Sequence, residues 1–365
     1  MNKGVLVLLG SGETAPGMTK VHRELLNRLN DVRAVNLDTA YGFQENVPQM
    51  TEKLLEYFNV SLQTDFTPLH FTNFATSSEV DRALVKQQIR EANYVFAGPG
   101  SPSYALHQWQ PLGLKDDLQA VLANDGVVCF SSAAALTIGA FTAPIYEIYK
   151  VGVEPYWLEG LNVIEVAGLN CVVVPHFDNN EGANYDTSCC YMGKRRLELL
   201  EKTLPTGTAT LGIDEHTALI IDLNDQTIRV LGRSNAYWRL NGDVLTLPNG
   251  STTPLSELQS FTPVLNVREE VTASLPTSPA DLATLALEGG PEGTEALAKL
   301  VQLASTGGEG YIEPTALIEG IIAARKNARA QSAYALADEL RDALIAGGID
   351  VKDSPEGSTW SIKSN

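Results

Sequence analysis

The chain has 365 residues, of which 44% are hydrophobic and 19% are charged, a composition typical of globular proteins with a sizeable core. This composition excludes disorder over the whole chain. The formal net charge of −18 repels phosphate backbones and disfavours nucleic acid as a partner. No apolar run reaches membrane-spanning length and no signal-peptide pattern is present, so we expect a soluble, cytoplasmic protein without a membrane partner.

The four cysteines predict neither a disulfide framework nor a metal centre. Cys129 and Cys171 lie in apolar runs, as expected for small buried residues. Cys189 and Cys190 are adjacent, which is a poor geometry for a mutual disulfide. Because no His or Cys spacing indicates zinc either, the sequence predicts no metal. No organic cofactor is implied either.

Short apolar runs alternate with helical patterns over the first two-thirds of the chain. The runs are bounded by Gly, Pro, Asn or Asp, as expected for buried strands, and cover 4–9, 32–37, 94–97, 127–130 and 171–174. Apolar residues repeat at helical spacing over 21–29 and 50–58, and a Ser-x-x-Asp cap opens a helix over 78–91. This alternation predicts a doubly wound, mostly parallel α/β sheet covered on both faces.

The pattern changes after Glu215. Residues 217–222 and 227–231 are separated by Asn and Asp, which predicts a β-hairpin. A second hairpin is expected around 241–246, where Gly and Asn gather. The end of the α/β part is therefore expected to be antiparallel.

We expect three parts along the chain. The main α/β domain is predicted over 1–265. A linker with helices is predicted over 266–315, because 274–281 is polar and rich in Pro and Ser. The Ala- and Leu-rich segment over 316–365 predicts a small helical hairpin that stops at Gly347.

The segment 126–139 carries the strongest signal for chemistry. A strand is followed by two serines and then by small helix-forming residues, which is the layout of a nucleophile elbow. In such an elbow a strained turn lifts a hydroxyl above the sheet, beside free N–H groups that can bind an oxyanion. The same pattern also fits an ordinary helix N-cap made by Ser131 or Ser132.

Polar groups follow several of the predicted strands. Gly100, Ser132, His176 and Glu215 each come just after a strand, and the carboxyl edge of an open parallel sheet is where ligands bind. A serine, a histidine and a carboxylate at one edge have the composition of a nucleophile, its base and the group that orients the base. The sequence therefore predicts a hydrolytic site at this edge.

Five short segments occur in a specific order and spacing. They are Leu8-Leu-Gly-Ser-Gly-Glu13, Gly98-Pro-Gly100, Phe130-Ser-Ser-Ala-Ala-Ala135, Pro175-His-Phe177 and Gly212-Ile-Asp-Glu215. Over about residues 3–235 the chain resembles the serine peptidase family of cyanophycinase and dipeptidase E. That resemblance implies a class I glutamine amidotransferase-like fold and a serine hydrolase that cleaves a peptide or related amide bond.

The resemblance also assigns roles to residues. Ser132 would be the nucleophile and His176 the base. The cyanophycinase branch points to Glu215 as the acid, whereas dipeptidase E takes its acid shortly after the nucleophile, where Glu147 is the nearest candidate. In the family, the oxyanion donors would correspond to the backbone N–H groups of Gly100 and Ala133, and the substrate would be a small peptide or amide.

Two departures from the family pattern support a competing interpretation. Phe130 and Ala134 replace both glycines of the family's Gly-x-Ser-Ala-Gly-Ala stretch, and a Phe there could close the elbow. The family's Gly-Gly-Asp-Gln loop is Gly98-Pro-Gly-Ser-Pro102 here, which removes its polar substrate contact. The alternative function is a non-catalytic binding or scaffold module with a degenerate site.

Four residues are further candidates for substrate contact. Ser101 lies in the glycine loop, and Asp178 opens an oxygen-rich run that lacks calcium-loop spacing. Arg195 and Arg196 each carry a guanidinium group, which can bind a carboxylate through two parallel hydrogen bonds.

A competing motif, Gly10-Ser-Gly-Glu-Thr-Ala15, is a weak dinucleotide fingerprint. We expect the Pro-Gly pair after it to break the helix that should hold the pyrophosphate.

The C-terminal segment carries a second set of ordered motifs. They are Ala323-Ala-Arg-Lys-Asn-Ala-Arg329, Tyr334-Ala-Leu-Ala-Asp-Glu-Leu-Arg-Asp342, Gly348-Ile-Asp-Val351 and Asp353-Ser-Pro-Glu-Gly-Ser-Thr-Trp360. Over about 316–362 the chain resembles the tRNA-binding end of cysteinyl-tRNA synthetase. Because the whole chain is acidic, we expect protein packing or homo-oligomer contact instead of tRNA binding, through Leu336, Leu340 and Leu344.

Overall fold

The computed structural model describes residues 3–262 continuously, together with 318, 321, 322, 325, 326, 329, 338, 341, 344, 349–354 and 357–362. The chain divides into two compact units, Met1–Val264 and Leu265–Asn365. The predicted linker with helices over 266–315 lies outside the described residues, as do Leu336 and Leu340.

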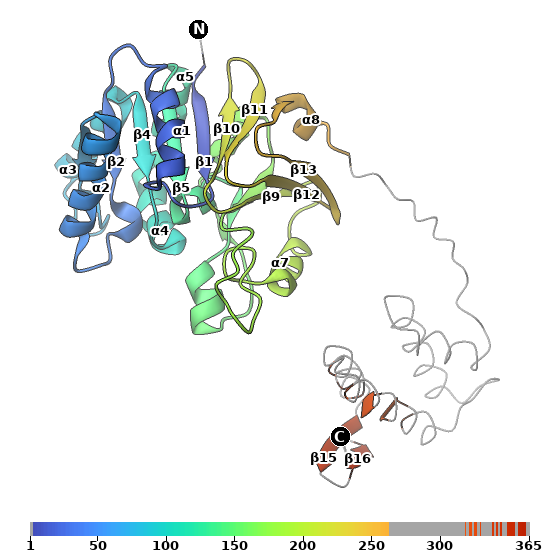
Figure 1. The fold of residues 1–365 in the computed structure, drawn as a ribbon. Coiled ribbons are helices and arrows are strands. Elements are labelled where there is room, and N and C mark those ends of the chain that lie inside the picture. Colours follow the sequence, from blue (N-terminus) through green and yellow to red (C-terminus); the bar gives the residue numbers. More distant parts are fainter. Residues whose placement is uncertain are drawn as a thin grey trace. The chain divides into compact units, whose positions relative to one another are not determined.

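An eight-stranded sheet with the strand order β14-β11-β10-β1-β5-β4-β2-β3 forms the centre of the first unit (Figure 1). Its parallel part consists of β1 (Val5–Leu9), β2 (Ala34–Leu37), β3 (Phe66–Leu69), β4 (Tyr94–Ala97) and β5 (Val127–Ser131). The antiparallel part consists of β10 (Thr217–Asp222), β11 (Thr227–Gly232) and β14 (Thr252–Pro254). The predicted, mostly parallel α/β sheet is confirmed, as is the first hairpin, β10–β11.

A second, four-stranded sheet has the order β13-β12-β9-β8. Its strands are β8 (Cys171–Val174), β9 (Ala209–Ile213), β12 (Ala236–Leu240) and β13 (Asp243–Leu247). β8 and β9 are parallel, whereas β12 pairs antiparallel with both β9 and β13. The second predicted hairpin is confirmed as β12–β13, and a small ribbon pairs β6 (Phe141–Thr142) with β7 (Leu158–Glu159).

Helices cover both faces of the eight-stranded sheet. One face packs against α1 (Pro16–Leu26) and α2 (Val47–Leu62), and the other against α3 (Glu79–Glu91), α4 (Pro102–Leu112) and α5 (Leu114–Ala123). The predicted cap of α3 is present, because the Ser78 and Asp81 side chains bond each other's backbone N–H groups. The shorter elements are α6 (Ala133–Leu136), α7 (Lys194–Glu201), α8 (Leu255–Gln259), η1 (Thr39–Tyr41), η2 (Glu147–Val151) and η3 (Val163–Ala167).

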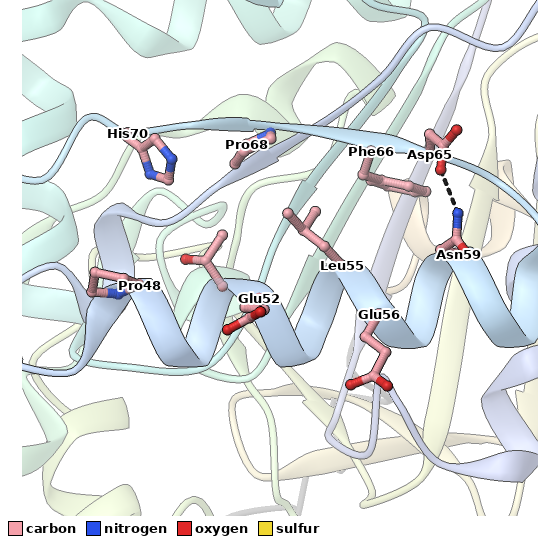
Figure 2. A pocket seen from close by; sticks show the side chains of 10 residues that line it. Pro48, Glu52, Leu55, Glu56, Asn59, Asp65, Phe66, Pro68 and His70 are labelled. Atoms are coloured by element: carbon pink, nitrogen blue, oxygen red, sulfur yellow. Dashed lines mark hydrogen bonds between the residues drawn. The ribbon is translucent and has the colours of Figure 1, made fainter.

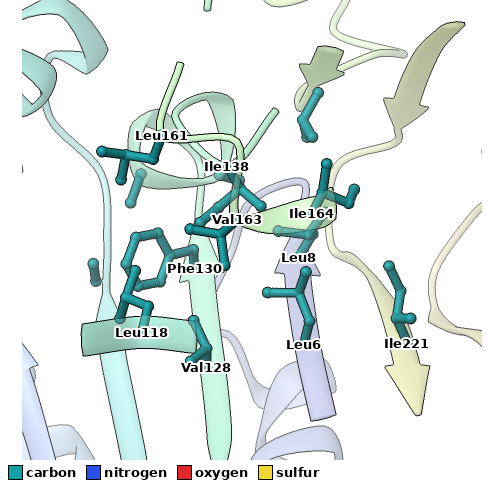
Figure 3. Packing of buried hydrophobic residues seen from close by; sticks show 14 of the residues in the cluster. Leu6, Leu8, Leu118, Val128, Phe130, Ile138, Leu161, Val163, Ile164 and Ile221 are labelled. Atoms are coloured by element: carbon teal, nitrogen blue, oxygen red, sulfur yellow. The ribbon is translucent and has the colours of Figure 1, made fainter. Parts of the chain in front are cut away.

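The apolar side chains of β1 point in turn to the two faces of the sheet, so β1 contributes to the core on both sides. Leu6 and Leu8 lie in the cluster on the α3–α5 face, where Phe130 and Val163 also pack (Figure 3). The other three residues of β1, Val5, Val7 and Leu9, lie in the cluster on the α1–α2 face. Since successive side chains of a strand point to opposite faces, a run of apolar residues is what a sheet buried on both sides requires.

The second unit has its own small apolar cluster. It contains Ile318, Ile321, Leu344, Ile349 and Val351. Strands β15 (Ile349–Ser354) and β16 (Gly357–Ile362) form an antiparallel hairpin. The predicted helical hairpin over 316–365 is therefore not helical throughout, because the residues after Gly347, where the predicted helix stops, pair as strands.

Within the described residues, no helix combines the length and the apolar character needed to cross a membrane.

Candidate active site

The side chains of Ser132, His176 and Glu215 are linked in series by two hydrogen bonds. We call these three side chains the relay. The Ser132 Oγ lies 2.9 Å from the His176 Nε2, and the His176 Nδ1 lies 2.9 Å from the Glu215 Oε1. Because an ionised carboxylate only accepts hydrogen bonds, Nδ1 must carry the ring proton and Nε2 is free to accept from the Ser132 hydroxyl. This is the arrangement in which an imidazole can take a proton from a hydroxyl.

The relay joins the two larger sheets of the first unit. Ser132 follows β5 of the eight-stranded sheet, whereas His176 and Glu215 follow β8 and β9 of the four-stranded sheet. The expectation of one common sheet edge is wrong. β10 pairs antiparallel with β1 and occupies the position beside it, so β8 and β9 pair with each other in a separate sheet.

Ser132 has the strained backbone that an elbow requires. Its φ is 53° and its ψ is −122°, a sparsely populated region for a residue with a side chain. The Ser132 side chain caps no donor of α6, so it does not serve as an ordinary N-cap. The N–H of Ser132 donates to the Leu9 carbonyl at 3.1 Å and the N–H of His176 to the Gly10 carbonyl at 3.2 Å, so the end of β1 holds both residues.

The neighbouring residues of the elbow point elsewhere. The Ser131 hydroxyl is fully buried and donates to the Glu13 Oε2 at 2.8 Å. Phe130 is also fully buried, and its ring centroid lies 5.6 Å from that of Trp109 in the core. The Phe that could have closed the elbow therefore packs under α4, away from the Ser132 hydroxyl.

Gly10 and Gly12, which lie in the weak dinucleotide fingerprint and in the first segment of the family resemblance, have a structural role. A Cβ at Gly10 would lie 2.0 Å from the Asp214 carbonyl oxygen, and one at Gly12 would lie 2.1 Å from the His216 Nδ1. The glycines thus let the end of β1 approach the turn that carries Glu215. Pro16 is the first residue of α1, so it starts that helix, and the expectation that it breaks the helix is wrong.

Glu215 is held as an ionised carboxylate. The hydrogen bond from His176, reinforced by one from the Asn179 side chain, lowers the pKa of Glu215 to about 2. The Glu215 backbone N–H donates to the Asp178 Oδ1 at 2.7 Å. Sequence reasoning noted the oxygen-rich run that begins at Asp178, but did not single out Asn179 within it.

Glu147, the other candidate acid, has a different partner. Its Oε1 accepts from the Ser103 hydroxyl at 2.6 Å, while its Oε2 is enclosed and has no hydrogen-bond partner within residues 3–262. The His176 Nδ1 contacts Glu215, not Glu147. The geometry therefore favours Glu215 as the group that orients His176.

The backbone N–H groups of Gly100 and Ala133, the two predicted oxyanion donors, make no protein hydrogen bond within residues 3–262. Ala133 is the first residue of α6, directly after Ser132. Gly100 has a φ of 149°, and a Cβ there would lie 2.0 Å from the Ala40 carbonyl oxygen. Only glycine fits at this position, which lies between β4 and α4.

The other candidate contacts are placed as follows. Ser101 is buried and caps α4, where its hydroxyl accepts from the Tyr104 N–H. Arg195 is exposed on α7, and Arg196 donates to the Met192 carbonyl. Within the described residues, neither arginine makes a hydrogen bond to the relay.

An aromatic group adjoins the imidazole and was also missed. The ring centroids of His176 and Tyr191 lie 5.7 Å apart, and Tyr149 stacks on Tyr191 at 5.4 Å. Three consecutive residues that end at Tyr191 have φ between 55° and 66°. The N–H of Cys190 donates to the His176 carbonyl, which ties this turn to the histidine.

Two other features of the described residues lie outside the relay. No group of three or more His, Cys, Asp or Glu side chains in the described part of the chain could hold a metal ion.

A groove of about 600 Å³ runs between α2 and the edge strand β3, with Glu52, Leu55 and Phe66 in its lining (Figure 2). Because β4 and β2 separate β3 from β5, this groove is distinct from the Ser132 site.

The fold is shared with a solved peptidase. Over 69% of this chain and 97% of the other, it is similar to a peptidase from an acI-B1 actinobacterium, with a TM-score of 0.54 and 20% sequence identity. At this level of identity the likeness establishes the architecture. No protein-family model matches the chain.

Curated relatives match only part of the chain. Cysteine–tRNA ligase of Beutenbergia cavernae is 53% identical over 47 residues, which is 13% of this chain and 10% of that protein. The ligase of Bifidobacterium longum is 30% identical over 161 residues, which is 42% of this chain and 27% of that protein. The chain thus spans about a quarter or less of these relatives, in agreement with a resemblance limited to a segment.

Proposed function

We propose that this protein is a serine hydrolase that cleaves a peptide or related amide bond. The observation that carries the proposal is the relay, in which a strained serine, a histidine and an ionised glutamate are joined by two hydrogen bonds of 2.9 Å. The fold shared with a solved peptidase supports it. In this proposal Glu215, and not Glu147, is the acid.

The chemistry follows from the direction of the hydrogen bonds. The Ser132 Oγ attacks the carbonyl carbon of the substrate while the His176 Nε2 takes the hydroxyl proton. Glu215, which remains ionised at neutral pH, stabilises the resulting imidazolium through Nδ1. His176 then gives the proton to the leaving amine, and a water molecule, activated in the same way, hydrolyses the acyl-enzyme.

Two backbone N–H groups are the proposed donors to the charged intermediate. Ala133 directly follows Ser132, Gly100 lies in the loop between β4 and α4, and neither N–H group donates to a protein acceptor within residues 3–262. In the proposed mechanism both donate to the oxyanion that forms on the carbonyl oxygen. Backbone donors serve this purpose well, because they need no reorganisation when the charge develops.

A fluorophosphonate probe tests the proposal without knowledge of the substrate. The wild-type chain should be labelled, Ser132→Ala should abolish labelling, and Ser131→Ala should retain most of it. Glu215→Gln should slow labelling at least about 100-fold, because the imidazolium loses its counter-charge. Glu147→Gln is the matched control and should change the rate by less than about threefold.

Two results would count against the proposal. Labelling that persists in Ser132→Ala would show that another residue is the nucleophile. A wild-type chain that is not labelled would favour the non-catalytic alternative.

A further inference from the structure

Asn179 is buried next to the relay and has a fixed amide orientation. The residue is only 2% exposed, and its Oδ1 accepts from the Glu181 N–H at 3.2 Å. Because that oxygen faces a backbone donor, the amide nitrogen must face the other way. This nitrogen donates to the Glu215 Oε1 at 3.0 Å.

The Asn179 amide and the His176 ring share one oxygen atom. The Glu215 Oε1 accepts from both, and within residues 3–262 no other group donates to this carboxylate. Asp178 holds the same residue from its backbone, through the Glu215 N–H. The loop that carries His176 thus holds Glu215 at both its main chain and its side chain.

We propose that Asn179 is a positioning residue that fixes the Glu215 carboxylate in the orientation that His176 requires. The inference rests on the proposed function of the relay. The terminal torsion of a glutamate is soft, so a carboxylate held by one hydrogen bond can rotate. With Asn179 in place, Oε1 is held from two directions and the Nδ1 proton of His176 has a fixed acceptor.

Other charged or titratable groups near Glu215 do not replace Asn179. His216 favours the ionised carboxylate through its charge, and the Tyr191 hydroxyl and the buried Cys190 thiol lie within electrostatic range. Asp178 contacts the backbone of Glu215. Removal of Asn179 therefore leaves Glu215 ionised but less firmly oriented.

The first test measures the rate of fluorophosphonate labelling of the full chain. Asn179→Ala should slow labelling about tenfold, because the hydrogen bond that orients the acid is lost, while the final labelled fraction stays that of the wild type. Asn179→Asp has nearly the same shape but places a second carboxylate against Glu215, so it should be at least as slow. Asn180→Ala is the matched control, because Asn180 is exposed in the same loop.

The second test observes the His176 Nδ1 proton by NMR and does not depend on turnover. Its resonance is assigned by its loss in His176→Gln. It should be sharp in the wild type and in Asn180→Ala, and broadened or lost in both Asn179 variants. An unlabelled wild-type chain would contradict the proposed function, and the resonance alone would then decide whether Asn179 positions Glu215.

Two results would overturn the inference. A resonance that stays sharp in Asn179→Ala would show that Asn179 does not orient the acid, whatever the labelling rate. A reduced labelled fraction with a normal rate would show that Asn179 only supports folding.

Discussion

At the scale of single residues, Gly10 connects the segments that build the relay. Its carbonyl accepts from the His176 N–H, and its own N–H donates to the Thr217 carbonyl at 2.9 Å. The Asp214 carbonyl oxygen occupies the space that a side chain at Gly10 would need. The packing of Gly10 against Asp214 therefore affects the positions of His176 and Glu215 in the site.

Gly10→Ala should both destabilise the protein and slow labelling of Ser132. The added methyl group must displace the Asp214 carbonyl, which costs about 1–3 kcal/mol as overpacking, and the shift moves Glu215 away from His176. Gly17→Ala is the control, because a Cβ there meets nothing within 4 Å and Ala favours a helix. Urea unfolding and labelling rates measure both effects. If Gly10→Ala had the wild-type stability and the wild-type labelling rate, Gly10 would not link packing to the geometry of the relay.

At the scale of elements, α1 is anchored to the sheet by His22. The imidazole is fully buried, with Nε2 2.9 Å from the Glu13 carbonyl oxygen and Nδ1 2.9 Å from the Tyr94 hydroxyl. A carbonyl only accepts, so Nε2 carries a proton. Burial lowers the pKa of His22 to about 4.

His22 should make the unfolding free energy fall on mild acidification. Since its pKa is about 4 in the folded protein and 6.5 unfolded, the unfolded chain binds the extra proton between these values. Between pH 7 and pH 5 the unfolding free energy should fall by about 2 kcal/mol from this group. Denaturant titrations of wild type and His22→Gln test this. The same loss in both proteins would exclude His22 as its source.

Local patterns predicted most strands and helices, but not how the strands pair. The apolar runs and turn residues located β1, β4, β5 and β8, together with both hairpins, because these signals lie within each segment. That β8 and β9 form their own sheet depends on β10 pairing with β1, which no local pattern encodes. In β15 the alternation of Ile349 and Val351 with Asp350 and Lys352 is a strand signal, although the surrounding composition is helical.

The site residues also divide into those that local sequence patterns reveal and those that only the fold reveals. Ser132, His176 and Glu215 could be selected because each follows a strand, but their hydrogen bonds require the fold. Asn179 and Tyr191 could not be selected, because what matters is their contact with Glu215 and His176. Gly10 was visible as a motif, and only the packing against Asp214 showed its role.

At the scale of the whole molecule, charge and resemblance favour different partners. The C-terminal segment is similar to part of cysteine–tRNA ligases, whereas the chain carries a net charge of −18. Arg325, one of its cations, is buried in the second unit. Affinity for a phosphate backbone comes mainly from accessible Lys and Arg that displace counterions.

The full chain should therefore not bind tRNA at micromolar concentration near physiological salt. A salt-dependent titration with labelled tRNA measures this, with an Arg325→Ala/Arg329→Ala double variant as the comparison. Micromolar binding with a steep salt dependence that the double variant loses would instead support tRNA contact by this segment.

The structure of the phosphonate adduct tests the central claim most directly. We expect phosphorus bonded to the Ser132 Oγ, and the phosphoryl oxygen, which stands in for the oxyanion, accepting from the N–H groups of Gly100 and Ala133. His176 should remain bonded to Glu215. Phosphorus on another residue, or an oxygen that contacts neither N–H group, would contradict the proposed mechanism.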